Sequence, residues 1–195
     1  MNFKQALILA MVVFSCSAPK EEGKAVVNEH EQHDHSAHSD TSNSKSPRTA
    51  SMANIGSNHV HIDYSAPSVR GRHIFGGLVA LDEVWVTGAH SATTISFSED
   101  IMIDGNIIAK GKYALFTIPK EKSWTVILNS NFAQHLADDY DQSEDVLRVE
   151  VENIESIEPV EQLRFDVTSA GNENGELAFY WSNRGFLLSL SKGTI

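Results

Sequence analysis

The sequence has a single cysteine, Cys16, among its 195 residues, and it also lacks other features that mark common protein classes. One thiol cannot form an intramolecular disulfide, so the folded part must be stable through its core alone. Beyond the N-terminal segment, no hydrophobic stretch approaches the roughly 20 residues that a membrane-spanning helix needs. Gly-x-Ser-x-Gly, His-Glu-x-x-His and phosphate-loop motifs are absent. These absences argue against the familiar hydrolases, metalloproteases and nucleotide-dependent enzymes.

Basic residues are scarce as well: 15 Lys and Arg stand against 26 Asp and Glu, which gives a net charge of −11. A surface of that sign repels polyanions, so nucleic acid is not expected as a partner. The same sign favours cations as ligands, although acidity commonly serves only to keep a protein soluble.

The N-terminal residues have the pattern of a secretory signal. Lys4 precedes an apolar run from Ala6 to Phe14, which is too short to span a bilayer as a helix. Val13-Phe14-Ser15-Cys16 resembles the lipobox of bacterial lipoproteins, in which the cysteine becomes the lipid-modified N-terminus of the mature protein. We therefore predict a signal peptide over residues 1–15 and lipidation of Cys16, with acyl chains holding the protein on a membrane. Ordinary cleavage near Ala18 and an uncleaved anchor are the alternatives.

A short charged motif follows the cysteine. Lys20-Glu21-Glu22 resembles the signal that moves Bacteroidetes-type lipoproteins to the cell surface. The predicted location is therefore the outer membrane, with the protein facing either the periplasm or the exterior.

Residues 16–51 have the composition of a disordered linker, because they contain almost no large apolar side chains. Within this linker lie four closely spaced histidines: His30, His33, His35 and His38. Interleaved imidazoles and carboxylates can ligate Zn²⁺, Cu²⁺ or Ni²⁺. The alternative is a solvated tether in which histidine is one more hydrophilic residue.

From residue 52 to 195, alternation of apolar and polar residues with period two predicts a single domain of strands. Glycine- and proline-containing turns separate the alternating runs, and residues 131–141 are expected to be irregular or briefly helical. The sequence therefore predicts about ten short strands in an all-β, antiparallel sandwich of jelly-roll or immunoglobulin-like type, or a closed barrel. The strongest runs are 58–64, 94–98, 112–118, 124–128, 147–151, 177–181 and 186–190, the last two separated by a turn at Gly185.

Several ordered blocks of this domain resemble the DUF2911 family. They include Ile62-Asp63-Tyr64-Ser65-Ala66-Pro67-Ser68-Val69-Arg70-Gly71-Arg72 and Gly111-Lys112-Tyr113-Ala114-Leu115-Phe116-Thr117-Ile118-Pro119. The resemblance implies an exported all-β domain and carries no activity with it. One block departs from the family pattern, which tends to read Arg-Thr-Gly-Ala-Asn-Glu-Ala-Thr. This chain has Val86-Thr87-Gly88-Ala89-His90-Ser91-Ala92-Thr93 there, without the arginine and the glutamate.

That block is the best candidate for a ligand site. Small residues allow the backbone to approach a ligand, and hydroxyls and imidazole supply directional contacts. The candidate residues are Thr87, Gly88, His90, Ser91, Thr93 and Thr94. The alternative is a tight connection between strands in which Gly88 supplies a positive φ and the hydroxyls satisfy loop amides.

Two arginines upstream, Arg70 and Arg72, form a second candidate, because guanidinium groups bind carboxylates or sulfates in a forked geometry. The alternative is that these charges pin a long loop through ion pairs and carbonyl contacts. The tryptophans Trp85, Trp124 and Trp181 are expected to be core or rim anchors, or an aromatic platform for a sugar.

His59 and His61 are spaced so that both would lie on one face of a strand. The pair could chelate a metal with a third ligand from His73, His90, Asp82 or Glu83, or it could belong to a wet strand face. The leading hypothesis from sequence is thus a non-catalytic envelope module that binds a small molecule, a glycan or a protein. The alternatives are a transition-metal-binding protein that uses the His-rich linker and a hydrolase centred on His90.

Overall fold

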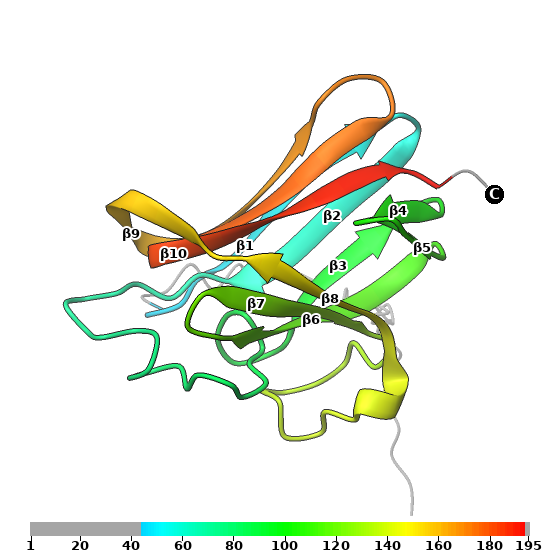
Figure 1. Cartoon of the computed structure of the whole chain (residues 1–195). Coiled ribbons are helices and arrows are strands. Elements are labelled where there is room, and N and C mark those ends of the chain that lie inside the picture. Colours follow the sequence, from blue (N-terminus) through cyan, green and yellow to red (C-terminus); the bar gives the residue numbers. More distant parts are fainter. Residues whose placement is uncertain (1–43, 194–195) are drawn as a thin grey trace, which may run out of the picture. The chain divides into compact units, whose positions relative to one another are not determined.

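The computed structural model describes residues 44–193, apart from the side chains of residues 156 and 157. Within this range the chain forms two antiparallel β-sheets, so the predicted all-β sandwich is confirmed (Figure 1). The larger sheet has the order β1 (Arg48–Ile55), β2 (Asn58–Ser65), β3 (Thr93–Phe97), β6 (Gly111–Pro119), β7 (Ser123–Asn129) and β8 (Asp145–Glu152). The smaller has the order β5 (Asn106–Ile108), β4 (Ile101–Ile103), β10 (Asn174–Lys192) and β9 (Ile154–Ser169).

The first strand begins at Arg48, inside the segment that composition assigned to the linker. It pairs with β2 over its whole length, from Arg48 opposite Ser65 to Ile55 opposite Asn58. Most of its side chains are exposed, so it shows little of the apolar alternation by which a strand is recognised in a sequence. The paired backbone, rather than burial, defines this strand.

The last two strands form a long hairpin, and the predicted break in its second strand is wrong. Gly185 does not end a strand: β10 runs continuously through it, paired with β9. Two register shifts next to Ser182, whose φ is +55°, let the hairpin bend without breaking. Gly185 itself lies close to the backbone, because a Cβ there would be 2.3 Å from the Phe179 carbonyl oxygen.

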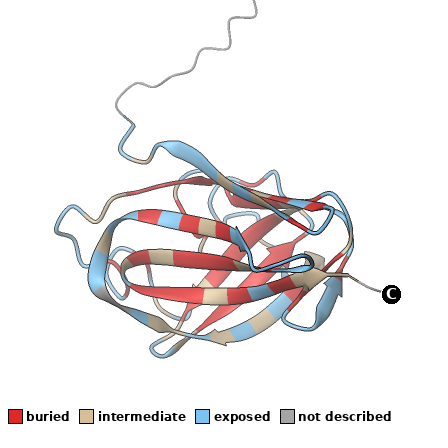
Figure 2. Cartoon of the chain, turned by 90° about the horizontal axis from the view of Figure 1, so that it is seen from above, coloured by how far each residue is buried: buried red, intermediate tan, exposed pale blue. Residues whose placement is uncertain are grey.

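The core lies between the sheets and is rich in aromatic rings. Figure 2 shows buried, intermediate and exposed residues mixed along the strands. In β8 they alternate, as one buried face and one wet face require, whereas nearly all residues of β7 are buried. Burial of each large side chain contributes about 1.5–3 kcal/mol, which is how a domain without disulfides can be stable. The largest fully buried side chains of this core are Trp124, Trp181, Phe165, Phe179 and Phe186. Phe116 belongs to a second, smaller cluster with Val86, Ala114 and Ile127.

The connection between β2 and β3, residues 66–92, is long but tied down. The Val69 N–H donates to the Glu161 carbonyl of β9 at 2.7 Å, and the Leu163 N–H donates back to the Pro67 carbonyl at 2.9 Å. Further along, Phe75 inserts its ring edge-on between Trp124 (5.1 Å) and Trp181 (6.0 Å). This loop is therefore a fixed part of the domain, and it supplies most of the candidate site.

A second connection, residues 131–141, is irregular as predicted, and a short 3-10 turn, Gln142–Glu144, follows it. The fully buried Asn129 holds it: its side-chain N–H groups donate to the Asp141 carbonyl and to Asp145 Oδ1, both at 2.9 Å. Within residues 44–193, no helix has the length and apolar character to cross a membrane.

Candidate ligand-binding cavity

The long β2–β3 loop covers a cavity of about 480 Å³, which we call the Trp85 cavity. Its lining comes from the residues before β1, from the loop itself, from the segment after β7 and from β10. The lining residues are Lys45, Ser46, Pro67, Arg70, Arg72, Leu78, Val79, Trp85, Val86, Gly88, Ala89, His90, Leu136 and Trp181. Four of the sequence-predicted candidates, Arg70, Arg72, Gly88 and His90, are therefore brought together in one place.

Two tryptophans form the aromatic wall of this cavity. The Trp85 and Trp181 rings are stacked, with centroids 5.8 Å apart and an interplanar angle of 18°. The Trp85 Nε1–H donates to the Gly88 carbonyl at 3.2 Å, which fixes that ring against its own loop. The Trp124 Nε1–H, outside the cavity, likewise donates to Asn153 Oδ1 at 3.0 Å.

Trp181 differs from these two. Its side chain is only 1% exposed, yet its Nε1–H has no hydrogen-bond partner among the described residues. Leaving a buried N–H unpaired costs about 1–3 kcal/mol, and nearly all buried donors in proteins are paired. Trp181 is part of the cavity lining, but its N–H is covered by neighbouring atoms, so an acceptor from outside the protein would reach it only after a small movement of those atoms.

The charged part of the lining is entirely basic: it contains Lys45, Arg70 and Arg72 and no Asp or Glu. The Arg72 side chain donates to the Val69 carbonyl (3.0 Å) and to the Ser68 carbonyl (2.5 Å). Arg70 makes one long side-chain contact, 3.4 Å, to the Lys45 carbonyl. Within the described chain, neither guanidinium forms an ion pair.

The two arginines differ in their contacts. Arg72 helps to pin the loop through carbonyl contacts, and ion pairs take no part in this. Glu161 approaches Arg70, but its carboxylate accepts from the backbone N–H of Arg70 at 2.9 Å rather than from the guanidinium. The positive charge of Arg70 is therefore not neutralised by a neighbouring acid.

The backbone of the 86–92 segment differs from the tight connection that the sequence suggested. Left-handed conformations occur at Thr87 (φ +51°) and His90 (φ +64°), and not at Gly88. Gly88 is required for another reason, because a Cβ there would lie 3.0 Å from Thr93 Oγ1 and 3.1 Å from the Ser65 carbonyl oxygen.

Left-handed residues gather around the cavity. Of seven non-glycine residues with positive φ in the described chain, Arg70, His90 and Leu136 line the cavity and Thr87 adjoins it. Such conformations are uncommon outside glycine and cluster at ligand-binding and active sites. A fully buried β-branched residue such as Thr87 is the most unusual of them.

The hydroxyl candidates lie in different surroundings. The Thr87 hydroxyl is 3.0 Å from the Thr117 hydroxyl, and Thr93 Oγ1 donates to the Thr87 carbonyl at 3.0 Å, both in the buried interior. Thr94 is also buried, within β3. Ser91 is exposed and pairs through a backbone bridge with His135. None of these four lines the cavity; the first two stabilise the loop that does.

The histidines of the domain are dispersed. His59 and His61 lie on one face of β2, with ring centroids 6.1 Å apart, and contact Asn54 Oδ1 (2.9 Å) and Asp63 Oδ2 (3.3 Å) respectively. In the part of the chain that the structure describes, no three His, Cys, Asp or Glu side chains gather where they could hold a metal ion. His90 lines the Trp85 cavity, and no described hydroxyl or carboxylate hydrogen-bonds to its ring.

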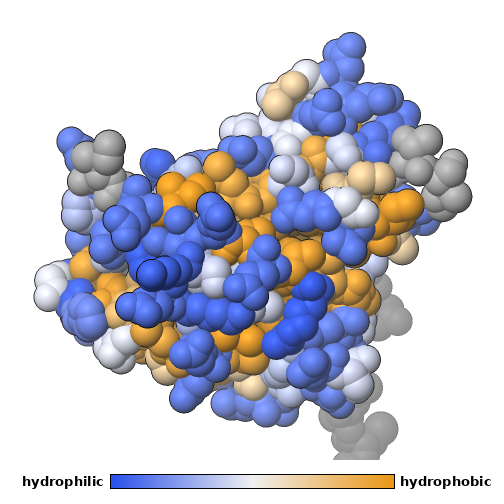
Figure 3. Space-filling view, viewed as in Figure 1, coloured by the Kyte–Doolittle hydropathy of each residue, from blue (hydrophilic) through white to orange (hydrophobic). Residues whose placement is uncertain are grey.

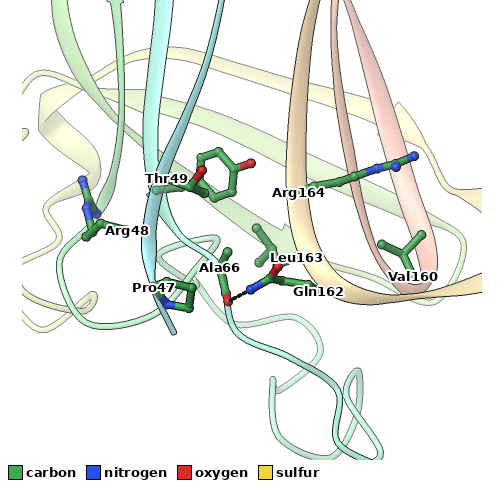
Figure 4. A pocket seen from close by; sticks show the side chains of 9 residues that line it. Pro47, Arg48, Thr49, Ala66, Val160, Gln162, Leu163 and Arg164 are labelled. Atoms are coloured by element: carbon green, nitrogen blue, oxygen red, sulfur yellow. Dashed lines mark hydrogen bonds between the residues drawn. The ribbon is translucent and has the colours of Figure 1, made fainter. Parts of the chain in front are cut away.

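A second cavity, of about 500 Å³, lies at the seam between β1 and β9. Figure 4 shows that its two arginines, Arg48 and Arg164, point away from each other, while the Gln162 side chain donates to the Ala66 carbonyl at 3.2 Å. Arg164 is paired with Asp166 at 3.3 Å. This cavity therefore assembles no cluster of reactive or charged groups.

A third cavity, of about 280 Å³, surrounds Arg184. Burial lowers the pKa of this guanidinium, which donates to Asn153 Oδ1 at 2.9 Å and to the Lys120 carbonyl. It also lies over the Trp124 ring at 4.8 Å. With these partners Arg184 joins the end of the β6–β7 hairpin to β10, which is a structural role.

The remaining sequence-based candidates, Cys16 and His30, His33, His35 and His38, lie outside the described residues. Among the residues that line the cavity, Lys45 and Leu136 were missed because each is an isolated residue in an irregular segment. Figure 3 shows that the face of the molecule seen in that view is a mixture of hydrophilic residues and hydrophobic areas.

Comparison with known proteins gives a family and nothing more specific. The profile of the family described as "Protein of unknown function (DUF2911)" matches residues 46–190. No curated protein and no solved structure matches the chain.

Proposed function

The chain belongs to the DUF2911 family, and from that premise we propose that it is a lipid-anchored binding protein of the cell envelope that holds a small organic molecule in the Trp85 cavity. The lipid anchor would be attached at Cys16, and the folded domain would present the cavity outside the cytosol. Catalysis has no part in this proposal.

The observation that carries the proposal is the convergence of distant segments on one cavity. Four parts of the chain meet around the stacked Trp85 and Trp181 rings: the residues before β1, the 66–92 loop, the segment after β7, and β10. The cavity volume of about 480 Å³ lies within the usual range of roughly 300–1,000 Å³ for small-molecule sites. Its lining is mainly apolar with a few polar groups, as is typical of such sites.

The assay uses the tryptophans themselves. Two of the chain's three tryptophans line the cavity, so an occupant should change the intrinsic fluorescence of the chain from Ser17 onward. A library of small organic acids, amides, amines and sugars would be titrated, and hits would be confirmed by calorimetry. We expect micromolar binding by at least one class.

The matched variants are Ala89→Trp and Ala109→Trp. Ala89 lines the cavity, so an indole there should fill the space and abolish binding, whereas Ala109 is exposed in a turn outside it. The absence of any binder in the library, or unchanged binding by a folded Ala89→Trp protein, would refute the proposed site.

The anchor is tested in cells. Metabolic labelling with an alkyne fatty acid should mark the parent protein in the membrane fraction, and Cys16→Ala should remove the label and release the protein. A parent protein that stays unlabelled and soluble in the cytosol would rule out the envelope role.

A further inference from the structure

Resting on the proposed function, we infer the chemical class of the ligand: an organic anion with an apolar body and a hydrogen-bond acceptor. The anionic group meets Lys45, Arg70 and Arg72, and the apolar body covers the exposed parts of Leu78, Trp85 and Leu136. The acceptor pairs with the Trp181 Nε1–H after a small shift of the atoms that cover it. Each part of this assignment comes from a separate observation.

The sign of charge in the cavity is opposite to that of the protein. The whole chain carries 26 acidic and 15 basic side chains, yet the lining includes three basic residues and no acidic one. Charges of one sign in a cleft with low-dielectric walls concentrate counter-ions of the opposite sign. An amine ligand would meet three like charges there, whereas a carboxylate or sulfonate would be attracted.

Arg70 is the best placed of the three to bind this group. Its guanidinium has a single, long contact to a carbonyl. The Glu161 carboxylate accepts a hydrogen bond from the backbone N–H of Arg70 and not from the guanidinium. A guanidinium binds a carboxylate through two parallel hydrogen bonds, which gives geometric specificity as well as energy. Lys45 is exposed and has no described side-chain partner, so it can add a second charge.

The apolar part of the lining disfavours a small bare anion as the preferred ligand. Leu78 (51% exposed), Leu136 (40% exposed) and the partly exposed Trp85 would stay uncovered if only a phosphate or acetate were bound. An aryl or branched alkyl group that covers this wall removes apolar surface from water, which is favourable at about 25 cal/mol per Å².

The unpaired Trp181 N–H adds the third requirement. The other two indole N–H groups of the chain are paired with a carbonyl and with an amide oxygen. Trp181 is as deeply buried as a core residue and yet has no such partner in residues 44–193. A ketone, ether or amide oxygen on the ligand body would complete its hydrogen bonding.

The experiment compares matched ligands on the unmodified chain from Ser17 onward. The first set is 4-phenylbutyrate, its primary amide and 4-phenylbutylamine. We expect the carboxylate to bind at least tenfold more tightly than the amide, because a hydrogen bond to a charged group is worth about 1.5–3 kcal/mol and tenfold corresponds to about 1.4 kcal/mol. The amine should not bind, and added salt should weaken the carboxylate alone.

The second set tests the acceptor. 4-Oxo-4-phenylbutyrate carries one ketone oxygen where 4-phenylbutyrate has a methylene, and it should bind several-fold more tightly. Trp181→Phe should remove that difference while leaving 4-phenylbutyrate binding little changed. If Trp181→Phe does not fold, the comparison of the two ligands on the parent protein still tests whether an acceptor on the ligand strengthens binding.

The protein variants test the charge. Arg70→Gln and Lys45→Gln should each weaken the carboxylate about tenfold and leave the amide within about twofold, since one ion-paired contact is lost. Arg48→Gln removes the same charge from an exposed side chain outside the cavity and should change neither.

The outcomes separate the two proposals. If amides or amines bind as tightly as carboxylates, and Ala89→Trp abolishes their binding, the cavity is a binding site but the assigned ligand class is wrong. If no member of either set or of the wider library binds, the proposed function itself fails. Carboxylate binding that is unaffected by Arg70→Gln and Lys45→Gln also overturns the assignment.

Discussion

Gly88→Ala should damage both the stability of the domain and the Trp85 cavity. The added methyl group would lie 3.0 Å from Thr93 Oγ1 and 3.1 Å from the Ser65 carbonyl oxygen, closer than ordinary van der Waals contact. Neither neighbour can move easily. Thr93 Oγ1 is committed to the Thr87 carbonyl, and Ser65 is paired with Arg48 at the end of β2.

The expected magnitude follows from two opposing effects. Overpacking a tight site costs about 1–3 kcal/mol. Gly88 does not have a left-handed φ, so alanine also restricts the unfolded chain and returns about 0.4–1 kcal/mol. The midpoints of these two ranges give a net loss of about 1.3 kcal/mol of unfolding free energy, or a fall of roughly 3–5 °C in Tm for a domain of this size.

The same change should reach the ligand, because the Gly88 carbonyl accepts the hydrogen bond from the Trp85 indole. A shifted Trp85 would disturb the stacked pair, and we expect affinity for a carboxylate ligand to fall about tenfold, equivalent to about 1.4 kcal/mol. Urea unfolding and fluorescence titration measure the two effects on one sample.

Gly105→Asn is the control. Gly105 has φ +79° with nothing within 4 Å of its Cβ position, and asparagine tolerates that conformation, so stability should change by no more than about 0.5 kcal/mol. A Gly88→Ala protein that matches the parent in stability and in affinity would show that close approach is not what requires glycine at this position.

Two further predictions concern residues 129–148. Burial, together with a hydrogen bond to Asp145, raises the pKa of Tyr140 from 10.0 to about 12. Between these values the folded state keeps a proton that the unfolded state loses, so unfolding free energy should fall as pH rises from 10 to 12. For Tyr140→Phe, the fall in unfolding free energy between pH 9 and pH 11, measured by urea titration, should be smaller than for the parent protein. An equal fall in the two proteins would contradict the raised pKa of Tyr140. Asn129→Ala should cost about 2–4 kcal/mol, because it removes a fully buried amide and leaves three part-buried partners of the 131–145 segment unpaired. Asn172→Ala, in an exposed bend, should cost under about 0.5 kcal/mol, and equal losses by the two variants would refute this reasoning.

Period-two alternation was sufficient to predict the fold class and the strands that have one buried face. It succeeded for β2, where Val60, Ile62 and Tyr64 are buried, and for β8, whose more buried and exposed residues alternate. It failed for β1, whose residues are mostly exposed, and for β9, whose first half contains a proline and has its isoleucines and valine at a spacing of three. These strands are specified by backbone pairing with β2 and β10, which a single sequence does not display.

Gly185 shows a related limit of local patterns. Glycine usually marks a turn, but here it permits close packing within a strand that bends at Ser182. Whether a strand ends at a glycine or continues through it depends on pairing with the neighbouring strand. A local sequence pattern does not contain that pairing.

The candidate site was predictable residue by residue, but not as a cavity. Arg70, Arg72, Gly88 and His90 were selected for their chemistry. Their meeting with Lys45, Leu136 and Trp181 depends on how the residues before β1, the β2–β3 and β7–β8 connections and β10 come together in the fold. The unpaired indole N–H is likewise a property of tertiary structure, since tryptophan in a strand predicts only burial.

Two of the positions at which this chain departs from the family pattern lie in the lining of the Trp85 cavity. Val86 and His90 stand where the resemblance implies arginine and asparagine, and both line the Trp85 cavity. Valine in place of arginine makes the wall more apolar and would leave the proposed anion binding to Arg70, Arg72 and Lys45, while His90 adds an imidazole to the lining. Positions 86 and 90 lie in the loop between β2 and β3, outside the strands of the sandwich. We therefore expect that exchanges at these positions change the proposed ligand preference without changing the fold.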